Sequence, residues 1–236
     1  MDNRQANILK YKNSEERRKF LNQSGKIAKV DFFRRNCHKF IKTGEKIIDI
    51  GGGAGVWADI IREKGITANI YAVDISADAL GERNEKDISI VSDMENIPYS
   101  DNFFDRAMFF ASLHHVRNTN KALLEAKRIV KNSGYIFLYE PVSLRLLLTG
   151  KNLAPTADGV EYNLSLNYLR QEIKKLDGQV EYRYFEGFIK RFFKNSSADF
   201  LKIIIIIEEF INKIPVINYL AGFFSDTVIF VIKVSK

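Results

Sequence analysis

The sequence predicts an α/β protein in which helices cover both faces of a mostly parallel sheet. Short apolar runs alternate with segments of helical periodicity between residues 46 and 141, and such alternation is typical of strand–helix–strand units. A cluster of glycines directly follows the first apolar run, as expected where a strand turns sharply into a helix. At 236 residues the chain is long enough for one domain with added elements. We therefore predict a single domain over residues 1–236.

The length and composition of each segment decide which elements are expected. Short apolar runs fit buried strands, and apolar residues three or four apart fit helices. The sequence predicts strands at 46–50, 69–73, 88–91, 104–110, 135–139, 180–185 and 227–234, and helices at 56–63, 119–130 and 165–176. Right-handed crossovers place the carboxyl ends of parallel strands at one edge of the sheet. We expect the functional site at that edge.

Composition limits the setting and the partners. Cys37 is the only cysteine, which excludes an internal disulfide framework and a zinc site built from cysteines. The polar N-terminus carries no apolar stretch of signal-peptide length, so a cytoplasmic location is expected. The formal net charge of +7 permits attraction to phosphate-bearing surfaces, and a nucleic-acid partner therefore stays open.

The glycine cluster, residues 51–55, is the first candidate for a ligand site. Glycines between a strand and a helix let the backbone approach a ligand and aim the N–H groups of the helix N-terminus at it. Residues 53–58 also satisfy the dinucleotide pattern G-x-G-x-x-A, with Asp74 about 20 residues further on. Asp49, two residues before the first glycine, instead favours a ligand that carries an amine.

With Asp49 included, the loop resembles motif I of class I S-adenosylmethionine-dependent methyltransferases, and the small-molecule group that includes the ubiquinone-pathway enzymes is the most similar. The resemblance extends over about residues 46–141. It implies a Rossmann-like, doubly wound sheet of seven strands with the last strand antiparallel, and S-adenosyl-L-methionine as the cofactor. In the loop, it implies a cofactor-binding role for Asp49, Gly51, Gly53 and Gly55.

The resemblance implies further cofactor contacts at the ends of the next strands. Asp74 corresponds to the acid that binds the ribose hydroxyls, a task suited to a carboxylate with two acceptor oxygens, and Ile75 would pack on the adenine. Asp93 would accept from the adenine amino group, and Met94 would line the ring. The stretch that begins at Ala111 is expected beside the methyl group.

The chain then divides into three regions. Residues 1–44, with apolar residues at helical spacing, predict a helical lead-in; residues 45–141 are the expected cofactor-binding core; and 142–236 form the expected substrate-side half. This half carries a helical insertion at 187–225. Charged residues divide its apolar segment into runs that are shorter than a membrane-spanning helix requires. Three interpretations of residues 188–224 stay open: a substrate lid, a surface for a homodimer or another partner, and peripheral contact with a membrane.

Two neighbouring histidines, His114 and His115, are the candidate catalytic residues. A neutral imidazole is the natural acceptor for a proton leaving a hydroxyl near pH 7. The alternative interpretation is that the two histidines only orient the loop after the fourth strand. Glu140 is a second candidate for contact with the acceptor. Trp57 is interpreted as a core aromatic. No acids and histidines have metal-ligand spacing, so no metal is expected.

Together these features predict methyl transfer from S-adenosyl-L-methionine to a small-molecule, hydrophobic acceptor through oxygen, nitrogen or carbon. Three alternatives stay open. The positive charge is compatible with an RNA methyltransferase, and the overlapping glycine pattern is compatible with an NAD(P)-dependent oxidoreductase. A binder that keeps the fold without catalysis is a third.

Overall fold

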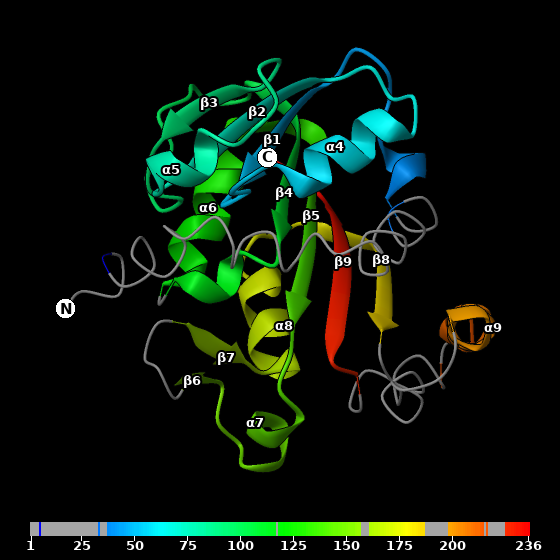
Figure 1. The fold of residues 1–236 in the computed structure, drawn as a ribbon. Coiled ribbons are helices and arrows are strands. Elements are labelled where there is room, and N and C mark those ends of the chain that lie inside the picture. Colours follow the sequence, from blue (N-terminus) through cyan, green and yellow to red (C-terminus); the bar gives the residue numbers. More distant parts are fainter. Residues whose placement is uncertain are drawn as a thin grey trace.

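The computed structural model describes residues 5, 33 and 37–236, except 117, 157–160, 187–197, 215 and 217–224. A seven-stranded sheet in the order β3-β2-β1-β4-β5-β9-β8 forms its centre, and a small hairpin, β6-β7, lies below it in the view of Figure 1. Most of the predicted lead-in falls outside the described residues. Its helical character stays a prediction, although Phe33 and Cys37 are fully buried in the core.

Most predicted strands and helices occur within one or two residues of their expected bounds. The large sheet consists of β1 (Lys46–Ile50), β2 (Asn69–Asp74), β3 (Ile88–Val91), β4 (Phe104–Phe110), β5 (Val130–Pro141), β8 (Gln179–Glu186) and β9 (Thr227–Lys233), and the hairpin of β6 (Leu153–Pro155) and β7 (Tyr162–Leu164). The helices are α4 (Val56–Glu63), α5 (Ala77–Leu80), α6 (Thr119–Ile129), α7 (Leu144–Leu148), α8 (Leu166–Lys174) and α9 (Ala198–Asn212), with short 3-10 helices η1 (His38–Phe40) and η2 (Leu113–His115).

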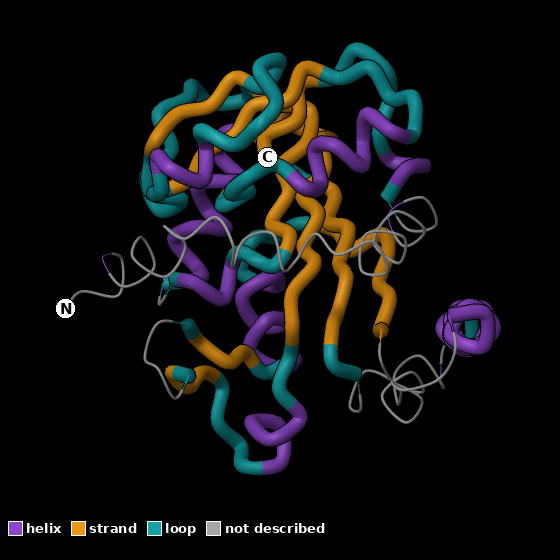
Figure 2. Tube along the Cα trace, viewed as in Figure 1, coloured by secondary structure: helices purple, strands orange, loops and turns teal. Residues whose placement is uncertain are grey.

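The direction of the strands confirms the predicted fold class. Strands β1 to β5 pair in parallel, whereas β9 is antiparallel to both β5 and β8, between which it lies. The carboxyl ends of β1, β2 and β4 therefore meet at one edge of the sheet. Figure 2 shows the helices arranged around this continuous set of strands.

Two hydrophobic clusters on opposite faces of the sheet form the core. Along β4, Phe109 belongs to one cluster and its neighbours Met108 and Phe110 to the other, because successive side chains of a strand point to opposite faces. Helices α6 and α8 contribute buried residues to the first cluster, and α4 contributes to the second. The sheet is thus covered on both sides, as the alternation of strands and helices predicts.

The described part of the insertion is the helix α9. Its inward side chains Ile204 and Glu208 are buried, whereas Ile206 and Phe210 are more than half exposed. No helix among the described residues is both long and apolar enough to cross a membrane. The hairpin β6-β7 was not predicted, because strands of three residues are too short to show a periodicity.

A buried ion pair holds the glycine loop against β1 and the segment that follows α5. Asp49, on β1, and Arg83 have side chains that are each 1% exposed, and Arg83 Nη1 lies 3.1 Å from Asp49 Oδ2. The same nitrogen donates to the carbonyl oxygens of Gly52 and Gly53, at 3.1 Å each. Burial raises the pKa of Asp49, and the guanidinium of Arg83 opposes this shift. Arg83 also binds Asp87 through Nε, at 2.9 Å, so one side chain connects β1, the loop and the segment before β3.

Arg83→Met is expected to lower the free energy of unfolding by roughly 3–5 kcal/mol, because Asp49 would stay buried without its cation. Urea unfolding measures the loss. Lys121→Met is the control: Lys121 is 56% exposed and lies 3.7 Å from Glu95, and exposed pairs contribute about 0–1 kcal/mol. The double variant Asp49→Asn/Arg83→Met should recover part of the loss. Equal unfolding curves for Arg83→Met and the control would contradict this role for the ion pair.

Candidate functional site

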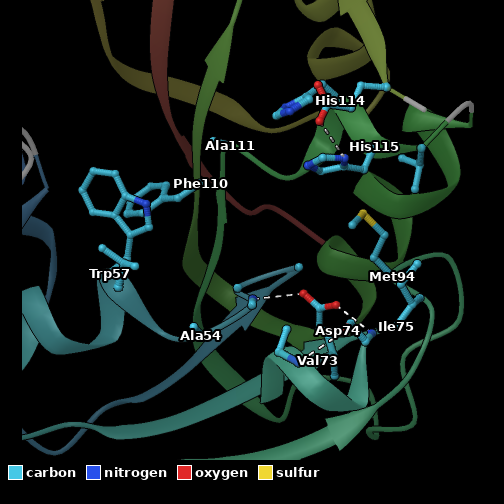
Figure 3. A pocket seen from close by; sticks show the side chains of 18 of the residues that line it. Ala54, Trp57, Val73, Asp74, Ile75, Met94, Phe110, Ala111, His114 and His115 are labelled. Atoms are coloured by element: carbon cyan, nitrogen blue, oxygen red, sulfur yellow. Dashed lines mark hydrogen bonds and ion pairs between the residues drawn. The ribbon is translucent and has the colours of Figure 1, made fainter. Parts of the chain in front are cut away.

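A cavity of about 480 Å³ lies at the carboxyl edge of the sheet, where the chain leaves β1 in one direction for β2 and later returns to β4 on the other side. Such a switch point is the usual ligand site of an open α/β sheet. The walls come from the glycine loop, the start of α4, the ends of β2, β3 and β4, and the helix η2 (Figure 3). Single residues of α5 and β9, two residues of β5 and Glu161, just before β7, complete them.

The glycine loop brings its backbone to the cavity. Gly51, Gly53 and Gly55 have φ angles of 67°, 47° and 83°, in the left-handed region that side chains disfavour. A Cβ on Gly52 would lie 2.1 Å from Asp49 Oδ2, so the position has no room for a side chain. Gly51 and Gly53 line the cavity, and Gly55 caps the N-terminus of α4.

Asp49 lies beneath this loop and is not among the described residues that line the cavity. Its Oδ2 is bound by Arg83, while its Oδ1 has no hydrogen-bond partner among the described residues. In the structure, Asp49 therefore supports the loop from below. Direct contact between Asp49 and the amine of a ligand stays a prediction.

Asp74 connects the end of β2 to the glycine loop. Its Oδ2 accepts from the Gly53 N–H at 3.0 Å, and its Oδ1 accepts from the Ser76 N–H at 2.9 Å. Burial raises the pKa of Asp74, and these two hydrogen bonds oppose the shift. A carboxylate has about four lone-pair sites, so Asp74 can still accept from two hydroxyls of a ligand. Ile75, the next residue, also lines the cavity.

Asp93 and Met94 form the neighbouring wall, after β3. Asp93 Oδ1 accepts from the Glu95 N–H at 2.9 Å, which fixes the turn. Met94 is 9% exposed and points into the cavity close to Ile75 (Figure 3). A carboxylate beside a thioether and an isoleucine can hold a flat polar ring such as adenine.

Glu140 organises the opposite part of the site from below. It is fully buried, and its Oε1 accepts from the N–H groups of Ser112 and Leu113 at 2.9 and 2.7 Å. Its Oε2 lies 2.8 Å from His114 Nδ1. Glu140 therefore positions η2 and the imidazole of His114, and it is not among the described lining residues, contrary to its expected contact with an acceptor. Ala111, at φ 56°, begins this turn and lines the cavity.

Among the lining residues that the sequence did not assign to the site, three bear on its chemistry. Trp57 is a core residue as interpreted, but it also lines the cavity, with Phe110 4.7 Å and Tyr139 5.4 Å from its ring centroid. Glu161 and Thr227 reach the cavity from just before β7 and from the start of β9. Neither position carries a sequence signal, because only the pairing of distant segments brings it to the site.

The polar groups of the cavity fit a nucleoside that carries positive charge. Asp74, Asp93 and Glu161 line the cavity, while no Lys or Arg does so among the residues that the structure describes. S-adenosyl-L-methionine requires a carboxylate for its ribose diol, a second polar group beside the wall that holds its adenine, and exposed backbone for its amino-acid end. The residues present therefore fit this cofactor.

Comparison with known proteins gives the same assignment for the core. Residues 48–138 match a family described as "Methyltransferase domain". The chain is 31% identical over 103 residues to a demethylmenaquinone methyltransferase of Paenarthrobacter aurescens, covering 42% of this chain and 40% of that protein. It is 26% identical over 160 residues to the ubiquinone/menaquinone biosynthesis C-methyltransferase UbiE of Haemophilus ducreyi, covering 60% and 62%. The chain thus spans about two to three fifths of the length of these relatives.

Solved structures extend the likeness in fold to nearly the whole chain. A SAM-dependent methyltransferase from Archaeoglobus fulgidus has a TM-score of 0.63 at 19% identity, covering 92% of this chain and 96% of that one. The PH0226 protein from Pyrococcus horikoshii has a TM-score of 0.62 at 17% identity, covering 91% and 93%. The sequence match and the strand order agree: residues 48–138 match the methyltransferase domain family, and they lie within a sheet of the same fold as these structures.

Proposed function

We propose that this protein transfers a methyl group from S-adenosyl-L-methionine to a small acceptor with an apolar body, through an oxygen, nitrogen or carbon atom. The observation that carries the proposal is the charge of the cavity, with three carboxylates and no described Lys or Arg in its walls. Such a wall favours a cationic ligand and disfavours the pyrophosphate of a dinucleotide. It therefore supports the methyltransferase over the NAD(P)-dependent alternative.

Each half of the cavity has its own task in this proposal. Asp74 holds the ribose hydroxyls, and Asp93 and Met94 hold the adenine, while the backbone of the glycine loop holds the amino-acid end. When bound, the cofactor supplies a methyl group activated by a sulfonium, and transfer depends mainly on alignment with the nucleophile. The residues of the chain thus contribute by fixing two ligands relative to each other.

The acceptor enters beside η2 in this proposal. His114 and His115 lie together on the side of the cavity opposite Trp57 and Phe110 (Figure 3). Glu140 fixes the ring of His114 through Nδ1. We assign both histidines to contact with the reacting group of the acceptor. The aromatic wall of Trp57, Phe110 and Tyr139 supports an apolar acceptor, as do the quinone-pathway names of the relatives.

For the insertion we favour a lid that contacts the acceptor. Helix α9 follows the carboxyl end of β8, on the same edge of the sheet as the cavity (Figure 1). Its exposed Ile203, Ile206 and Phe210 offer an apolar surface. Such a surface can also bind a second copy of the chain or a membrane. Sedimentation tests for the homodimer, and binding to lipid vesicles tests for the membrane contact.

Isothermal titration is expected to show binding of S-adenosylhomocysteine and much weaker binding of NAD. Asp74→Ala should weaken the affinity for S-adenosylhomocysteine by about 100-fold, because two charge-assisted hydrogen bonds of about 1.5 kcal/mol each are lost. Asp78→Ala is the control, since Asp78 is exposed on the neighbouring helix α5. Tighter binding of NAD than of S-adenosylhomocysteine would refute the assigned cofactor.

His114→Ala is expected to lower kcat of methyl transfer by about 100-fold while the affinity for S-adenosylhomocysteine stays within threefold, because in this proposal His114 faces the acceptor and not the cofactor. Transfer of labelled methyl groups to extracts, followed by partition into organic solvent, identifies the acceptor and provides the assay. His38→Ala, an exposed residue of η1, should retain full activity. An unchanged kcat in His114→Ala would remove this histidine from the acceptor site.

Ile206→Ser/Phe210→Ser is expected to raise KM for the acceptor about tenfold without a change in cofactor affinity, because the apolar face of the lid would no longer hold an apolar molecule. Leu148→Ser, at a 78% exposed position on α7, is the control. Both variants change exposed side chains, so folding is preserved. Equal KM values would count against the lid.

A further inference from the structure

His114, His115 and Glu161 form a cluster that the proposed function explains only in part, because it gives no role to Glu161. One nitrogen or oxygen atom from each residue lies within 4.8 Å of the others. The two imidazole centroids are 4.2 Å apart. The histidines come from η2, and Glu161 precedes β7 at a distant point of the chain. All three side chains line the cavity.

The spacing suits a shared ion better than a direct contact. His115 Nδ1 and Glu161 Oε1 are 3.9 Å apart, which is too long for a hydrogen bond. Two ligands of a tetrahedral ion, each about 2.1 Å from it, lie about 3.4 Å apart. A small movement of the Glu161 side chain, which is 20% exposed, closes this difference.

The surroundings of His114 are those of a metal ligand. Its Nδ1 is 2.8 Å from Glu140 Oε2, and Glu140 is itself held by two backbone N–H groups through Oε1. A carboxylate that accepts from one nitrogen of a histidine commonly fixes the ring so that the other nitrogen can bind a metal. In His114 that second nitrogen is Nε2.

The charge of the cavity also favours a cation at this place. Glu161 is one of three carboxylates in the wall, and the described lining residues include no Lys or Arg that would repel an ion. Two imidazoles and one carboxylate are typical ligands of Zn²⁺, Co²⁺ and Fe²⁺, whereas Mg²⁺ and Ca²⁺ prefer oxygen ligands alone.

We propose that His114, His115 and Glu161 bind one divalent transition-metal ion at the acceptor side of the cavity. Three protein ligands leave at least one coordination position open, and this position faces the cavity. The proposal replaces the expectation of no metal, which considered only spacing along the sequence and could not include Glu161. It rests on these three side chains and Glu140, and it does not depend on methyl transfer.

Titration of the metal-stripped protein with Co²⁺ alone, followed by visible absorption, tests the site. We expect saturation at one equivalent with the absorption of a four- or five-coordinate ion. His115→Ala and Glu161→Gln should each raise the Kd for Co²⁺ at least tenfold. His38→Ala removes the third histidine of the chain, which is exposed, and should bind Co²⁺ like the wild type.

Thermal unfolding separates loss of the site from loss of the fold. Without metal, His115→Ala and Glu161→Gln should unfold near the wild-type Tm, whereas the rise in Tm on adding Co²⁺ should occur in the wild type and His38→Ala only. No saturable binding, undiminished binding in both variants, or displacement of Co²⁺ by equimolar Mg²⁺ would each overturn the proposal. Binding of S-adenosylhomocysteine is measured separately, so failure of the cofactor assignment is distinguished from failure of the metal site.

Discussion

The cavity depends above all on the buried ion pair between Asp49 and Arg83. The carboxylate occupies the space where Gly52 would carry a side chain, and the guanidinium binds the two loop carbonyls above it. The backbone of the loop can therefore approach a ligand, while the charges of Asp49 and Arg83 neutralise each other beneath it. Asp74 adds a hydrogen bond to Gly53 from the side, so that the end of β1 and the end of β2 are fixed together.

Glu140 plays a comparable part on the other side of the switch point. Like Asp49, it is a buried carboxylate beneath the cavity, and it satisfies backbone N–H groups where Asp49 satisfies a guanidinium. Each carboxylate shapes a turn that presents the groups facing a ligand. The site thus contains two sets of carboxylates. Asp49 and Glu140 are buried and support the walls, whereas Asp74, Asp93 and Glu161 line the cavity.

The sequence was sufficient for the sheet, because most of its strands contain a short apolar run between polar turns. It also placed Asp74, Asp93 and His114 at the cavity, since these residues follow consecutive parallel strands. It could not show that Asp49 and Glu140 lie beneath the walls. An acidic residue at the end of a strand has the same sequence pattern whether its side chain faces the cavity or the protein interior. Glu161 escaped prediction for another reason: its place is set by the hairpin β6-β7, which pairs segments without periodicity.

The position of β9 has a consequence for how the chain reaches this structure. Residues 227–233 fill the slot between β5 and β8 and pair with both. Until they have left the ribosome, both neighbours expose an unpaired edge of hydrogen-bonding groups, and on β5 this edge includes the apolar run Tyr135 to Tyr139. The nascent chain must therefore keep a half-finished sheet from associating with other chains while the whole insertion is synthesised.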